Sequence, residues 1–263
     1  MGVRFTIIGE QIEPAVLENV QVAVNGAQRD VAVWGLLTEP VLIVVHPSHR
    51  ALEQAVGLKD VAWLRAWAQY DRIDLQSPTT FGHRDYRPPL RELLAHELTH
   101  VFMYQRIGTR ETWNHIAIPF WFREGMGSWT SHQGYRRGTL VSVGRRLLTD
   151  HALLDPVLDG DALNRIDQPL AYAAAHWAFD RMVVDIGEEG VLGLLDDVRA
   201  ATSGPTPASA ASLPAGAAGD GSRHGDGTPF AAAFERRAGM TEGEFALLFV
   251  HSLEAAAGPQ VTK

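Results

Sequence analysis

Two histidines and a glutamate, His96, Glu97 and His100, are the residues of this chain best suited to carry chemistry. On a helix, residues four apart lie on one face about one turn apart, and the residue after the first is rotated by about 100°. Two neutral imidazoles so placed can bind one zinc ion, and the neighbouring carboxylate can accept a proton from zinc-bound water. The spacing therefore predicts half of a catalytic zinc site.

The helix that would carry this motif is indicated by other features of the sequence. Pro88 and Pro89 precede it and Gly108 follows it, as is typical of helix ends. The apolar residues between them recur with helical period: Leu90, Leu93, Leu94, Leu98, Val101 and Phe102. The alternative is an amphipathic helix whose histidines are ordinary, partly buried residues.

Glu124 offers the third ligand. It is the acidic residue of the segment 119–129, whose proline followed by a mostly apolar run predicts a second helix. A buried carboxylate needs a partner, and zinc would complete a His-His-Glu set with the fourth position left for water. The alternative is that Glu124 pairs with Arg123 or caps the helix at the surface.

Other ligand spacings are less suitable. A metzincin requires glycine and histidine where this chain has Met103 and Arg106, so that class is excluded. His115 and His132 are possible ligands by residue type, but neither lies in so apolar a helical segment, which indicates loop histidines.

Glu92 has two interpretations. It lies one turn before His96, so it could accept a hydrogen bond from the second ring N–H of that histidine. As an exposed carboxylate it would instead pair with Arg91 or Arg87.

The segments 96–100 and 121–125 together resemble the gluzincin metallopeptidases, especially the peptidase-MA-like domains related to thermolysin and aminopeptidase N. The second helix of that family commonly reads W-x-x-E-G-x-A, and here Gly127 stands at the alanine position. Arg123 precedes the glutamate where aminopeptidase N-like members carry asparagine, and no G-A-M-E-N motif occurs. An aminopeptidase is therefore not supported.

This resemblance implies that His96, His100 and Glu124 bind one Zn²⁺ per chain and that Glu97 is the general base. Tyr172 resembles the tyrosine that gluzincins place on a helix after the third ligand, where a hydrogen-bond donor stabilises the oxyanion. His176, one helical turn later, is the competing candidate. Alanines around both would let a substrate or another helix come close, and the alternative role of both is in core or helix-pair contacts.

The resemblance also implies an α+β, zincin-like fold, in which a small N-terminal mixed β-sheet lobe with the active-site helix precedes a mainly α-helical C-terminal lobe. We expect a single catalytic domain over 1–263, with lobes at about 1–108 and 109–263. A terminal pattern like that of bacterial domains of this kind agrees with it: Phe230, Phe234, Gly239 and Phe245.

Hydrophobic period predicts the elements that position these residues. Strands are expected at 4–8, 41–45 and 72–76, helices at 14–36, 51–56, 140–148, 170–186, 190–201 and 229–253, and 61–70 is open between strand and helix. If 72–76 formed a sheet edge facing the cleft, it would pair with an extended substrate. The Gly-, Ala-, Ser- and Pro-rich stretch 202–228 predicts a flexible surface loop.

The expected chemistry is hydrolysis of a peptide or protein substrate. Zinc would make its bound water acidic, Glu97 would take the proton and pass it to the leaving amine, and Tyr172 or His176 would hydrogen-bond the oxyanion. Two alternatives stay open: an inactive pseudo-peptidase that binds a partner and keeps zinc as a structural ion, and a zinc hydrolase of a non-peptide amide.

Composition narrows the classes of partner. A net charge of −8 without a basic stripe argues against nucleic acid, and no apolar run reaches the roughly 20 residues of a membrane span. Without cysteine, a zinc site must use histidine and carboxylate. The short apolar run at the N-terminus does not form a signal peptide, so we expect a cytoplasmic protein unless a leader has been removed; the oligomeric state is not indicated.

Overall fold

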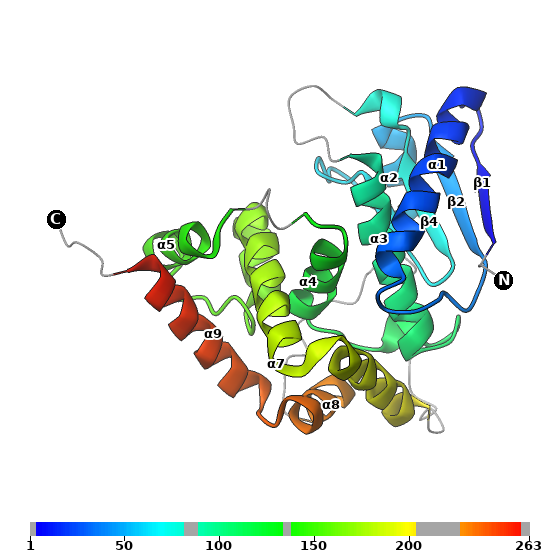
Figure 1. Cartoon of the computed structure of the whole chain (residues 1–263). Helices are drawn as coiled ribbons and strands as arrows, with labels where there is room; N and C mark the ends of the chain where they lie inside the picture. The colour runs from blue at the N-terminus through cyan, green and yellow to red at the C-terminus, as the bar shows by residue number, and fades with distance from the viewer. Residues whose placement is uncertain (1–3, 82–88, 134–137, 204–226, 259–263) are drawn as a thin grey trace. The chain divides into compact units, whose positions relative to one another are not determined.

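The computed structural model describes residues 4–81, 89–133, 138–203 and 227–258 (Figure 1). The described chain up to Ile116 belongs to one compact unit, and a second unit begins at Ala117. The first unit contains a small mixed β-sheet with helices, and the described part of the second is helical. The expected α+β class is therefore confirmed.

The sheet of the first unit has the strand order β1-β2-β4-β3. Its strands are β1 (Phe5–Ile8), β2 (Val41–His46), β3 (Ala66–Ala68) and β4 (Arg72–Gln76). β1 and β4 both pair with β2 in parallel, whereas β3 is antiparallel to β4. Side chains along β2 are alternately buried and half-buried, as the pleat of a strand requires.

The condition for substrate pairing at residues 72–76, that they form a sheet edge, is not met. These residues form β4, which lies inside the sheet and pairs with a strand on each side. The edge beside it is β3, within the segment 61–70 that the sequence left open. With only three residues, β3 is too short for hydrophobic period to identify.

Three helices accompany the sheet: α1 (Pro14–Val31), α2 (His49–Val56) and α3 (Leu90–Ile107). α1 and α3 contact one another, and at Gly26 a Cβ atom would lie 2.9 Å from Cδ of Arg91. The Nε–H of Arg91 donates to Asp30 Oδ2 at 2.8 Å, and this bond raises the pKa of Arg91. α1 is shorter than expected, because the chain turns after Val31 through Gly35, whose φ is +121°.

The helices described in the second unit are α4 (Phe120–Thr130), α5 (Leu140–Asp150), α6 (Gly160–Ile166), α7 (Gln168–Thr202), α8 (Pro229–Ala238) and α9 (Glu242–Ala257). Two predicted helices fall within α7, which is interrupted at Gly187 with φ +69°. The single helix predicted over 229–253 is wrong, because Gly239 ends α8 with φ +69° and Thr241 caps α9. α6 was not predicted.

A cluster of buried aromatic rings fills the core of the second unit around Trp121 of α4. The ring centroids of Phe230, Phe234 and Phe245 lie 6.3, 5.8 and 5.2 Å from that of Trp121. The indole N–H of Trp121 donates to Glu242 Oε1 at 3.1 Å. The C-terminal aromatic pattern of the sequence therefore anchors the helix that carries Glu124.

Nearly all of the loop predicted at 202–228 lies outside the described residues. Within the described chain, every helix is either too short or too polar to form a membrane span.

Gln105 fixes the end of α3 to two loops of the first unit. Its side chain is 2% exposed, and Oε1 accepts hydrogen bonds from the backbone N–H groups of Thr38 and Glu39 at 2.8 and 3.0 Å. Its Nε2 donates to the carbonyl oxygen of Tyr70 at 3.1 Å. One buried amide thus satisfies backbone groups far away in the sequence.

We expect Gln105→Leu to lower the free energy of unfolding by about 2–4 kcal/mol, because buried backbone groups lose their hydrogen-bond partners. Urea denaturation monitored by tryptophan fluorescence measures this. Gln21→Leu, which removes a side-chain hydrogen bond to Asn25 on the surface of α1, is the control and should change stability by less than about 0.5 kcal/mol. A similar small effect for Gln105→Leu would contradict the structural role.

Candidate metal centre

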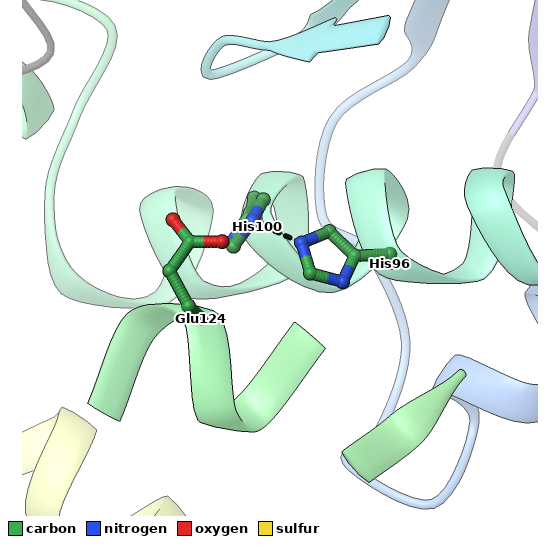
Figure 2. Close-up of side chains that lie close together, drawn as sticks. All are labelled: His96, His100 and Glu124. Carbon is green, nitrogen blue, oxygen red and sulfur yellow. Dashed lines mark hydrogen bonds between the residues drawn. The ribbon is translucent and has the colours of Figure 1, made fainter. Parts of the chain in front are cut away.

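His96 and His100 lie on successive turns of α3 with their rings turned toward one another (Figure 2). Their Nε2 atoms are 3.0 Å apart, and their rings meet edge to face at a centroid distance of 4.7 Å. Both residues are 6% exposed. Two nitrogens bound to one tetrahedral zinc at 2.0–2.1 Å would be about 3.3 Å apart, so the imidazole pair has nearly the separation that zinc requires.

Glu124 lies on α4 and is 7% exposed. The Nε–H of Arg123 donates to its Oε1 at 3.0 Å. Glu124 therefore pairs with Arg123, as one of the two alternatives to a metal site expected. The pair involves a buried carboxylate and does not lie at the surface. A carboxylate has about four lone-pair sites, so a hydrogen bond to one oxygen leaves capacity for a metal ligand bond.

The side chains of His96, His100 and Glu124 lie close together (Figure 2). One ligand atom of each lies within 4.8 Å of the other two, and all three residues are buried. In the described part of the chain, this is the group of His, Asp and Glu side chains that could hold a metal ion. Two imidazoles and one carboxylate are a donor set that zinc accepts at catalytic sites. The residues present therefore fit a zinc ion.

The other histidines considered as ligands do not belong to this group. His115, at the end of the short 3-10 helix Trp113–His115, and His132, just after α4, are both exposed. The expectation that they are not ligands is consistent with this placement.

Glu97 follows His96 on α3 and is 8% exposed. A buried carboxylate next to two imidazoles is unusual on a helix that serves only packing, because ionised side chains are costly to bury. Glu92 is half-buried. Arg91, one of the residues expected to pair with Glu92, makes its hydrogen bonds to Asp30 on α1, and Arg87 lies outside the described residues.

Tyr172 and His176 lie on α7 and contact α4 on either side of Glu124. The ring of Tyr172 packs edge to face against Phe120 at 5.5 Å, one turn before Glu124. Nδ1 of His176 is 3.4 Å from Oγ of Ser128, one turn after it. Both side chains are half-buried, and their contacts with α4 agree with the helix-pair alternative.

The sequence pattern did not reveal why glycine follows Glu124. A Cβ atom at Gly125 would lie 2.4 Å from the carbonyl oxygen of Ala175 and 2.6 Å from Cβ of Phe179. The alanines of α7 therefore allow α4 to come close, and the absence of a side chain at Gly125 sets the distance between the two helices. Because Gly125 is next to Glu124, this contact also positions the backbone of Glu124.

Tyr104 is a further neighbour of the histidine pair that the sequence analysis missed. Its ring is nearly parallel to that of His100 at 6.2 Å, and it lies 4.5 Å from the ring of Trp113. The signal was available, because Tyr104 follows His100 by one helical turn on the same face of α3.

No protein-family model, no curated protein and no solved structure matches the chain. Its function must therefore be inferred from the site itself.

We expect Gly125→Ala to destabilise the second unit by about 1–3 kcal/mol, because the added methyl group meets backbone atoms of α7 that cannot move freely. Thermal and urea denaturation would measure the loss. Gly243→Ala on α9 is the control, since a Cβ there would meet only Thr241 Oγ1, at 3.9 Å. Equal stability of the two variants would refute the close approach of α4 and α7.

Proposed function

We propose that this chain is a zinc-dependent hydrolase of peptide bonds with a zincin-like fold. His96, His100 and Glu124 bind the metal ion, and Glu97 is the general base. The observation that carries the proposal is the convergence of three buried ligand atoms within 4.8 Å, with a fourth buried residue of catalytic type next to the first ligand.

A bound zinc ion would supply a Lewis acid that polarises the substrate carbonyl and makes a water molecule acidic enough to react near neutral pH. Glu97 would accept the proton of the attacking water and deliver it to the leaving amine. A structural ion needs no base, so a buried glutamate directly after the first ligand favours catalysis over a purely structural zinc.

Negative charge builds on the carbonyl oxygen during the attack, and a hydrogen-bond donor stabilises it. Tyr172 and His176 are the candidates. His176 is positioned through Ser128 and Tyr172 through Phe120, which flank Glu124 on α4. Either side chain would therefore be held at a defined place along the helix that carries the third ligand.

A peptide is the favoured substrate because β3 forms one edge of the sheet in the unit that carries α3. An extended peptide can pair with the backbone of an edge strand, so the chain can be held largely irrespective of its side chains. We therefore assign to β3 the backbone pairing with substrate that the sequence analysis considered for residues 72–76. The antiparallel edge strand, the mixed sheet and the helix with both histidines support the zincin-like assignment.

We expect about one zinc per chain in protein purified without chelators, and only a minor fraction of that in Glu124→Ala, because two imidazoles alone bind zinc weakly. Elemental mass spectrometry measures the content. Glu254→Ala, at an exposed position of α9, should keep the wild-type content. Wild-type protein that takes up no zinc even after its addition would overturn the proposal.

Glu97→Gln should bind zinc and unfold like the wild type but lose about 10²–10⁴-fold in kcat/KM, because the side chain keeps its shape and no longer accepts a proton. Cleavage of a peptide library provides the assay. Glu18→Gln, exposed on α1, should be fully active. Unchanged turnover by Glu97→Gln would rule out Glu97 as the base, and zinc binding without any cleavage by the wild type would favour the binding-module alternative.

A further inference from the structure

We infer that Arg123 is a positioning residue that holds the carboxylate of Glu124 ready for the metal in the metal-free protein. The inference rests on the proposed zinc site. It concerns what the chain does with a buried carboxylate before any metal ion is bound.

The ion pair is not a by-product of helix geometry. Adjacent residues of a helix point about 100° apart and do not normally face one another. Even so, the Nε–H of Arg123 donates to Glu124 Oε1 at 3.0 Å, and the two side chains are only 18% and 9% exposed. The contact therefore requires side-chain conformations that bring the guanidinium and the carboxylate together in a largely buried place.

The chemistry of arginine suits this task. A buried carboxylate without a counter-charge is strongly destabilising, and arginine remains positively charged at any pH at which the protein is folded. Its planar fork also fixes the orientation of a carboxylate better than lysine does. Arg123 can therefore stabilise the buried Glu124 carboxylate when no metal ion is bound.

This arrangement has a consequence for metal affinity. A zinc ion must share Glu124 with the guanidinium, and the positive charge of Arg123 opposes the approach of a second cation. Stabilising the metal-free state also reduces what metal binding can add, since binding free energy is measured from that state. We therefore expect Arg123 to hold the Glu124 carboxylate in place in the metal-free protein. We also expect its opposing charge and its stabilisation of the metal-free state to outweigh the advantage of a fixed carboxylate, so that on balance Arg123 weakens zinc binding.

Arg123→Met tests this, because methionine keeps an apolar stem and removes both the charge and the donor. In EDTA at pH 8, its Tm should be at least about 5 °C below that of the wild type, as expected when a buried carboxylate loses a charged hydrogen-bond donor. Its zinc Kd, measured by competition with a chromophoric chelator, should be at least about tenfold lower than that of the wild type. Arg123→Lys, which keeps the charge, should restore most of the Tm.

Arg181→Met is the matched control. It removes an arginine of the same unit whose ion pair with Asp185 is largely exposed, and both Tm and zinc Kd should stay at wild-type values. If Arg123→Met does not fold in EDTA, recovery of folded protein on adding zinc would support the inference. If zinc does not restore it, Arg123→Gln, which removes the charge and keeps a donor, takes its place in the same two measurements.

The outcomes separate this inference from the proposed function. A wild type that binds no zinc would overturn both. A wild type that binds zinc, together with an Arg123→Met variant of unchanged Tm or of unchanged or weaker zinc affinity, would overturn the role of Arg123 alone. A merely structural arginine would lower the Tm without tightening zinc binding, so the affinity measurement decides.

Discussion

Burial of the Glu124 carboxylate imposes a requirement that much of the second unit meets. A charged group removed from water must be partnered and held in place, because its attraction to a partner falls steeply when either moves. Arg123 supplies a partner at 3.0 Å. The close approach of Gly125 to α7 and the aromatic rings around Trp121 hold α4 on two sides. Packing at a distance thus determines where one carboxylate points.

Helix α3 of the first unit also buries polar side chains, which need hydrogen-bond partners. They are His96, Glu97, Thr99, His100 and Gln105. Oγ1 of Thr99 donates to the carbonyl oxygen of Ala95 at 2.7 Å, and Gln105 connects the helix to two loops. The first of these bonds lies within the helix, whereas the bonds of Gln105 fix the C-terminal end of α3 to those loops. His96 and His100 are buried on successive turns of the same helix, and this sets the distance between their backbones.

The local parts of the fold follow from sequence patterns, and the errors lie where non-local contacts decide. β2 and the helix around His96 show clear periodicity, and both occur as expected. The order of strands does not follow from any one strand, because it depends on which neighbours pair, and β4 proved to be internal. The break at Gly239 was an exception: a glycine in the left-handed conformation is a local signal for a helix end, but the apolar pattern continues past it into α9.

The sequence by itself determined that His96, Glu97 and His100 lie on one helix in a ligand-and-base spacing, because helical period is a local property of the backbone. It also identified Glu124 as an acidic residue in an apolar helix. Only the tertiary structure decided that a ligand atom of Glu124 lies within 4.8 Å of the histidine nitrogens and that Arg123 donates a hydrogen bond to the Glu124 carboxylate. These contacts depend on the packing and burial of residues far apart in the chain, and a local sequence pattern does not encode such non-local interactions.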